Sequence, residues 1–152
     1  MEHKKLFFET SIVWREKTTG VMVTPGADEP IEVATPIEFP DGAEGKWSPE
    51  TLFLGAISSC YMTTFLSFAK RKNLAFINFR CHAAGVVEVI DGKLEFALVE
   101  VFPEVHLMEE EQKSIAEEIL KRTEKYCLIG NSVKSKILYH HLITAEQESA
   151  MA

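Results

Sequence analysis

The chain has 152 residues, of which 46% are hydrophobic and 26% charged, as is typical of one soluble globular domain. Its formal net charge of −7 argues against a nucleic-acid partner, because phosphate contacts need a clustered basic surface. No long apolar run follows the first five residues, so no signal peptide is visible. We therefore expect a single domain over residues 1–152, located in the cytoplasm, with its three cysteines as free thiols.

Three strands are predicted before the first helix. Residues 5–14 are rich in aromatic and β-branched types, which favours a strand. A polar loop from Arg15 to Thr18 leads to a second strand near Gly20–Thr24, and Ile31–Ala34 forms a third. The proline- and glycine-rich residues 36–47 are expected to form a loop.

A long helix is predicted to begin at Ser48 and to reach about Lys72. Ser48 is a typical N-cap, Pro49 suits the first helical position, and Glu50 lies in the first turn. The 19 residues from Thr51 to Ala69 carry no charge, which is near the length of a membrane span, but six of them are Ser or Thr. We therefore expect a central helix buried at a subunit interface, with no membrane association.

The second half of the chain predicts a hairpin, a helix and a last strand. Two strand-like runs, 76–90 and 93–107, flank Asp91-Gly92, which is a strong two-residue turn signal. A helix from about Glu109 to Cys127 should stop at Gly130, and a strand should follow near 137–144. The order βββ-α-ββ-α-β predicts an α+β fold, with an antiparallel sheet that packs two main helices on one face.

Two cysteines in unlike settings point to thiol chemistry. Cys60 lies within the uncharged helix, whereas Cys127 ends a charged amphipathic one. A thiolate is a strong nucleophile, and two thiols that meet in space can form and release a disulfide. Cys81 lies in a predicted strand without a motif and is expected to be structural. Because His140 and His141 are adjacent on a predicted strand, they would point to opposite faces, so no metal site is expected.

The segments Ser48-Pro49-Glu50, Ser59-Cys60 and Cys127 to Ser132 resemble the family of osmotically inducible protein C and the organic hydroperoxide resistance proteins (OsmC/Ohr). The resemblance covers nearly the whole chain and implies an OsmC-like fold in an intertwined homodimer. It implies a peroxidase that reduces organic hydroperoxides or hydrogen peroxide without a cofactor. It further implies Cys60 as the peroxidatic cysteine, Cys127 as the resolving cysteine and Glu50 as their acidic partner.

The residues add a requirement for a cation near Cys60. A mid-helix thiol in apolar surroundings ionises poorly, and the helix dipole should hold Cys127 protonated. An arginine oriented by Glu50 could activate Cys60. Glu50 and Cys60 are ten positions apart, roughly 15 Å along a helix, so Glu50 would come from the partner subunit.

The arginine departs from the family pattern. In the hydroperoxide-resistance branch it is typically found in the loop after the first strand, where this chain places Thr18. Arg15 is the leading candidate for the catalytic cation, with Lys17 another possibility, and Arg71, Arg80 and Arg122 are the remaining arginines.

Three functions are therefore open. The first is a peroxidase that forms a Cys60 sulfenic acid and then a Cys60–Cys127 disulfide, which an external dithiol reduces. The second is a non-catalytic binding or stress-response protein that lacks the catalytic arginine. The third is an enzyme that uses Cys60 for other thiol chemistry.

Overall fold

A computed structural model describes residues 4–147, and the chain divides into two compact units. The first unit extends to Phe53, and the second begins at Leu54. Helix α1, Pro49–Arg71, contains this boundary, so that its first turn belongs to the first unit and most of its length to the second. The assignment of the whole chain to one domain stays a prediction.

The first unit contains an antiparallel sheet in the order β1-β2-β3. Its strands are β1 (Ser11–Glu16), β2 (Thr19–Val23) and β3 (Ile31–Ala34), so the predicted second and third strands are confirmed. The prediction that the loop begins at Arg15 is wrong, because Arg15 still belongs to β1. The register shifts between Trp14 and Glu16, and the tight turn begins only at Lys17, whose φ is 49°.

The start of α1 is fixed by a reciprocal cap. The Thr51 amide donates to Ser48 Oγ at 3.1 Å, and the Ser48 amide donates to Thr51 Oγ1 at 2.8 Å. Pro49 at the first helical position needs no hydrogen-bond partner for its nitrogen. At the other end, Asn73 adopts a φ of 54° and the Leu74 amide bonds to the Ala69 carbonyl at 2.9 Å, which closes the helix.

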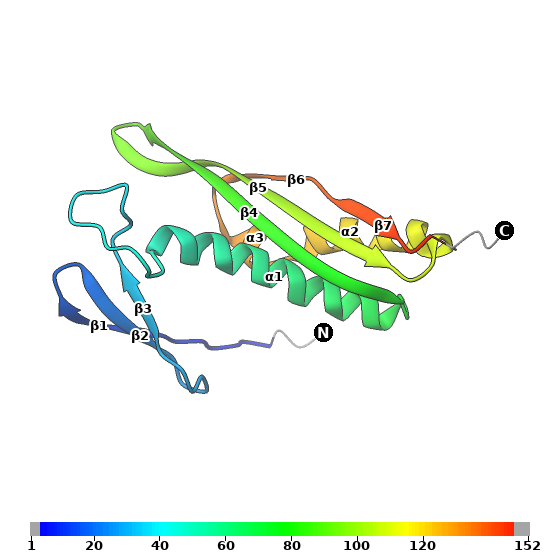
Figure 1. The fold of residues 1–152 in the computed structure, drawn as a ribbon, viewed down its shortest axis with the longest axis horizontal. Coiled ribbons are helices and arrows are strands. Elements are labelled where there is room, and N and C mark those ends of the chain that lie inside the picture. Colours follow the sequence, from blue (N-terminus) through cyan, green and yellow to red (C-terminus); the bar gives the residue numbers. More distant parts are fainter. Residues whose placement is uncertain (1–3, 148–152) are drawn as a thin grey trace. The chain divides into compact units, whose positions relative to one another are not determined.

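The second unit is built on a long β-hairpin (Figure 1). Strands β4 (Phe76–Ile90) and β5 (Lys93–Leu107) pair antiparallel, as predicted. Asp91 and Gly92 both have positive φ, 50° and 78°, which suits the right-handed twist of the hairpin.

The predicted last strand is two strands, β6 (Lys136–Tyr139) and β7 (Leu142–Ala145). Both pair with β5 in parallel, so the sheet is mixed rather than antiparallel throughout. The parallel direction follows from the helical connection after β5. This connection carries the chain back along the sheet, so that β6 and β7 run in the same direction as β5. The break falls opposite Phe102 and Pro103, and Pro103 has no N–H to donate to a neighbouring strand.

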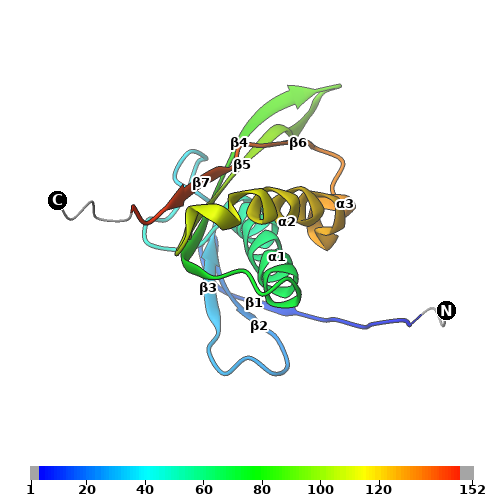
Figure 2. The ribbon, with the colours of Figure 1, turned by 90° about the vertical axis from the view of Figure 1, so that its right-hand side faces the viewer.

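The predicted second helix has three parts. A 3₁₀ turn, Glu110–Gln112, precedes α2 (Lys113–Tyr126), and α3 (Leu128–Ser132) follows after a break at Cys127, whose ψ is 110°. The prediction that Gly130 stops the helix is wrong, because Gly130 lies inside α3. Figure 2 shows α1 and α2 side by side on one face of the β4–β5 sheet, as expected for this α+β fold.

The core of the second unit lies between this sheet and the two helices. Ile57, Tyr61 and Phe65 are fully buried along one face of α1, and the Phe65 ring stacks on Phe79 with centroids 4.4 Å apart. The sheet and α2 contribute further buried side chains (Val99, Val101, Val105, Leu107, Ala116, Ile119 and Leu120).

By length and composition α1 could also cross a membrane, but the core helix of a soluble protein passes the same test.

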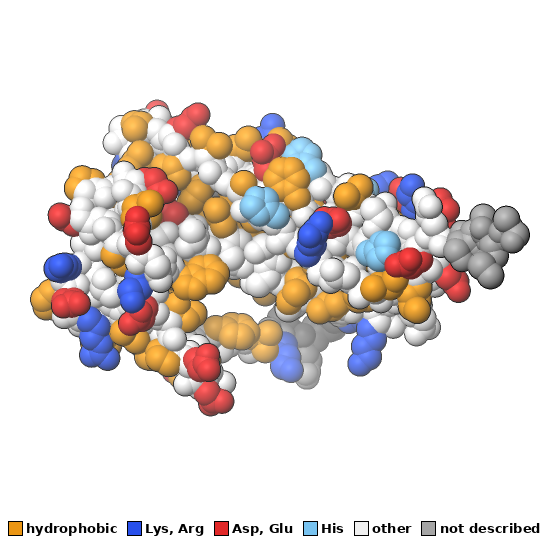
Figure 3. All heavy atoms as spheres, in the orientation of Figure 1, with side chains coloured by type: hydrophobic (Ala, Val, Ile, Leu, Met, Phe, Trp, Pro, Cys, Tyr) orange, Lys and Arg blue, Asp and Glu red, His pale blue; other side chains and the backbone are white. Residues whose placement is uncertain are grey.

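The opposite face of the sheet is polar and aromatic. Figure 3 shows histidine side chains next to hydrophobic and charged ones over this face. The Phe102 ring lies between His82 and His140, with centroids 5.9 and 5.0 Å away, and Arg80 binds Glu104 through two hydrogen bonds. Cys60 and Cys127 lie on the other, helical side of this sheet.

Candidate functional site

Two of the three cysteines meet in the second unit. Cys60 lies midway along α1 and is half-buried, whereas Cys127 is fully buried at the junction of α2 and α3. The two thiols lie close enough to shift each other's pKa: Cys127 lowers the pKa of Cys60, and Cys60 raises that of Cys127. The fold therefore brings together two thiols that are 67 positions apart in the sequence (127 − 60).

Four groups lower the pKa of the Cys60 thiol, and two of them lie within hydrogen-bond distance of its sulfur. The Ile129 amide donates to Sγ at 3.5 Å, and Thr64 Oγ1 lies 3.9 Å from it. The other two are the Leu128 amide and the Cys127 thiol. Burial by itself raises the pKa of the Cys60 thiol, but these groups outweigh burial and lower the pKa below its ordinary value.

The pKa of Cys127 moves in the opposite direction. Burial raises the pKa of the Cys127 thiol to about 11, and the nearby Cys60 contributes to the rise, although the Gly130 amide opposes it. The Cys127 thiol therefore keeps its proton at neutral pH, and this S–H group favours the thiolate form of the nearby Cys60. The arrangement makes Cys60 the thiol that ionises first.

These contacts correct the sequence-based expectation about Cys60. The sequence predicts that a mid-helix thiol needs a nearby cation, yet backbone N–H groups at the start of α3 lower its pKa. The sequence does not predict these amide groups, because Gly130 usually ends a helix and α3 is therefore not expected. Cys127 is protonated as expected, but burial is the main cause rather than the helix dipole.

Aromatic side chains and a third thiol surround the pair. The Tyr61 hydroxyl donates to the Leu120 carbonyl at 3.2 Å, and the Tyr61 and Tyr139 rings lie 5.6 Å apart. Burial raises the pKa of Cys81 to about 12, so Cys81 stays protonated at neutral pH. Its expected structural role is consistent with this inert state and stays a prediction.

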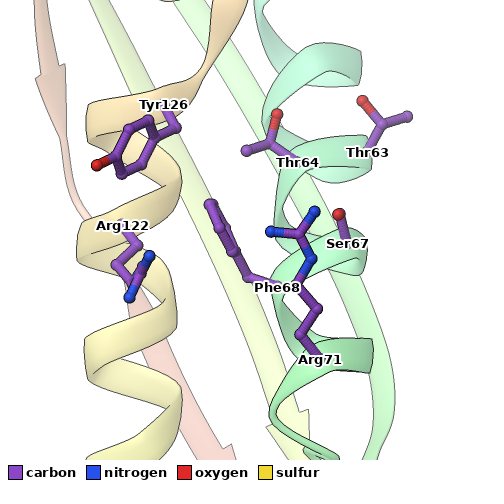
Figure 4. Close-up of a pocket in the computed structure, with 7 residues that line it drawn as sticks. All are labelled: Thr63, Thr64, Ser67, Phe68, Arg71, Arg122 and Tyr126. Atoms are coloured by element: carbon purple, nitrogen blue, oxygen red, sulfur yellow. The ribbon is translucent and has the colours of Figure 1, made fainter. Parts of the chain in front are cut away.

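A groove with a volume of about 430 Å³ opens between α1 and α2 (Figure 4). It is lined by three hydroxyl side chains, two aromatic rings and two guanidinium groups (Thr63, Thr64, Ser67, Phe68, Tyr126, Arg71 and Arg122). Thr64 belongs both to this wall and to the donors around Cys60. Sequence reasoning names both arginines but does not place them in a site, although Cys60, Thr64 and Arg71 recur at helical spacing.

The other predicted site residues, Glu50 and Arg15, belong to the first unit. Arg15 is exposed on β1. Glu50 Oε1 is buried and has no hydrogen-bond partner among residues 4–147. Their catalytic roles stay predictions. Within residues 4–147, no group of three His, Cys, Asp or Glu side chains is arranged to hold a metal ion.

Comparisons with known proteins agree with this fold. The sequence profile of a family described as OsmC-like protein matches residues 41–139. The uncharacterized protein YmaD of Bacillus subtilis is 24% identical over 118 residues, which cover 74% of this chain and 79% of YmaD.

Two solved structures are similar over nearly their whole lengths. An OsmC-like protein of unknown function from Vibrio cholerae superposes with a TM-score of 0.80 at 20% identity, covering 90% of this chain and 99% of that one. An organic hydroperoxide resistance protein from Elizabethkingia anophelis gives a TM-score of 0.73 at 15% identity, covering 95% and 100%. These likenesses establish the fold. The match of the family profile to residues 41–139, more than half of the chain, shows that the chain belongs to the OsmC-like protein family.

Proposed function

We propose that this protein is a thiol-dependent peroxidase that reduces organic hydroperoxides or hydrogen peroxide. One observation carries the proposal: the fold brings Cys60 and Cys127 close enough to shift each other's pKa, and the Ile129 amide donates to Cys60 Sγ at 3.5 Å. A thiolate beside a protonated thiol is the arrangement that a two-cysteine peroxidase needs. The similar protein from Elizabethkingia anophelis is named for organic hydroperoxide resistance, which supports the same class of substrate.

In the first step the Cys60 thiolate attacks the terminal oxygen of the hydroperoxide. A sulfur–oxygen bond forms as the oxygen–oxygen bond breaks, so that sulfur is oxidised and the peroxide is reduced. The leaving alkoxide takes a proton and departs as an alcohol, or as water if the substrate is hydrogen peroxide. Cys60 is left as a sulfenic acid.

In the second step Cys127 resolves the sulfenic acid. The Cys127 sulfur attacks the Cys60 sulfur, a disulfide forms, and the hydroxyl leaves as water with the Cys127 proton. The closeness of the two thiols supports this step. An external dithiol then reduces the disulfide by two exchange steps and leaves as its own disulfide.

The proposal includes a cytoplasmic homodimer in which the partner subunit completes the site. Glu50 has a buried oxygen without a partner among the described residues, which suits it to orient a guanidinium by charge-assisted hydrogen bonds. Arg15, exposed on β1, is the proposed source of that guanidinium. Such a cation would stabilise the negative charge on the leaving alkoxide. The amide groups of α3 have a different role, because they lower the pKa of Cys60.

Purified protein tests the proposal directly. It should consume cumene hydroperoxide in the presence of dithiothreitol, and Cys60→Ser should abolish this activity. Without dithiothreitol, Cys127→Ser should consume one equivalent of peroxide and stop as the Cys60 sulfenic acid, because no internal thiol resolves it, whereas the wild type should stop as the disulfide. Cys81→Ser is the matched control and should keep multiple turnover.

Activity retained in Cys60→Ser would refute the assignment of the nucleophile. If the wild type consumes no peroxide and forms no disulfide, the non-catalytic binding function expected as the alternative is favoured.

A further inference from the structure

The α1 wall of the groove leads from a thiol to an arginine. Cys60, Thr64, Ser67, Phe68 and Arg71 follow one another at offsets of 4, 7, 8 and 11 from Cys60. Residues at such spacing share one face of a helix. A molecule that lies along this face therefore has a guanidinium at one end and, at the other, Thr64, whose hydroxyl oxygen lies 3.9 Å from Cys60 Sγ.

The α2 wall runs the same way. Tyr126 directly precedes Cys127, and Arg122 lies one turn before Tyr126. Figure 4 shows Tyr126 on the level of Thr64 and Arg122 further along the groove on the level of Phe68. Both walls thus lead from the cysteine pair to an arginine.

The two arginines flank one aromatic ring and lack acidic partners among the described residues. The Arg71 and Arg122 guanidinium carbons lie 5.7 and 5.2 Å from the Phe68 ring centroid. Lys72 binds Glu118, the carboxylate one turn before Arg122, at 3.9 Å. Within residues 4–147 no carboxylate lies within ion-pair distance of either guanidinium. In a chain with a net charge of −7, this is a locally cationic groove.

We propose that this groove binds the anionic end of an organic ligand, with Arg71 and Arg122 holding a carboxylate. Guanidinium groups bind carboxylates through paired, charge-assisted hydrogen bonds. The body of the ligand passes Ser67 and Thr64 and reaches Cys60. The inference rests on the proposed function, for which it names the substrate class: hydroperoxides that carry a carboxylate group.

The test compares cumene hydroperoxide bearing a para-carboxylate with its neutral methyl ester, using neutral dithiothreitol as the reductant. The wild type should have a lower KM for the carboxylate. Arg122→Gln and Arg71→Gln should each raise that KM by about tenfold and leave the KM for the ester unchanged. Arg80→Gln is the matched control, because it removes one arginine from the outer face of the sheet, where Arg80 pairs with Glu104.

Equal effects on carboxylate and ester, or none on either, would overturn the inference. An acidic dithiol, dimercaptosuccinate, provides a second arm: if the variants change the KM of this reductant alone, the groove serves the reductant and the substrate assignment is wrong.

Calorimetry with unreactive para-isopropylbenzoate separates this inference from the proposed function. Binding that is lost in Arg122→Gln, in a protein that turns over neither hydroperoxide, would support the anion site and refute the peroxidase. Turnover of both hydroperoxides with no binding that depends on Arg122 or Arg71 would support the peroxidase and refute the anion site.

Discussion

Replacing Thr64 by Val tests the electrostatics around Cys60. Thr64 Oγ1 lies 3.9 Å from Cys60 Sγ, further than the 3.5 Å of the Ile129 amide, and it is one of four groups that lower the Cys60 pKa. A hydrogen bond to a charged group contributes about 1.5–3 kcal/mol, so this long one should contribute about 0.5–1 kcal/mol. On the acid side of the titration, the rate of Cys60 alkylation should therefore fall by about two- to fivefold.

The assay follows iodoacetamide labelling of the Cys60 peptide by mass spectrometry across pH. Thr63→Val is the matched control, because Thr63 Oγ1 donates to the Cys60 carbonyl at 3.1 Å and is not among the donors to its sulfur. Both changes remove one hydroxyl from the same helix and keep a β-branched side chain. An unchanged or faster rate in Thr64→Val, or equal effects of the two variants, would refute the hydrogen-bond explanation.

Two further predictions concern stability. The free energy of unfolding should fall as pH rises above about 9, because the unfolded Cys127 thiol ionises near 9.0 whereas the folded one holds its proton to about 11. This contribution is fully present below the unfolded pKa and is lost as pH rises through the folded one. Urea titrations should show a flatter alkaline decline in Cys127→Ala, and an unchanged slope would contradict the cause given. Gly85→Ala should destabilise the protein by about 1–3 kcal/mol, because its Cβ would lie 2.7 Å from the Phe96 ring. A thermal midpoint equal to that of the wild type would show that the ring moves freely.

The elements predicted well are those that a local signal determines. Asp91-Gly92 set the hairpin, because both residues tolerate the positive φ that its turn needs. Ser48 and Pro49 set the start of α1 for equally local reasons.

The errors arose where distant residues decide. The break between β6 and β7 depends on Pro103, which lies opposite it in β5 and is more than 30 positions away. Gly130 usually signals a helix end, yet here it lies inside α3, where a Cβ would come 2.9 Å from the Tyr139 hydroxyl.

The site followed the same division. Motif resemblance singled out Cys60 and Cys127, which the fold brings together. The amide donors of α3 and the arginine groove depend on how α1, α2 and α3 pack, and no pattern local to one helix encodes that packing.

The most direct test of the central claim is mass spectrometry of non-reduced peptides after one equivalent of cumene hydroperoxide. The claim is that Cys60 is the reactive thiol and Cys127 its resolving partner. A Cys60–Cys127 disulfide should then be the main product, with Cys81 still alkylatable. A sulfinic acid at Cys60 with Cys127 still free, or a disulfide that includes Cys81, would contradict it.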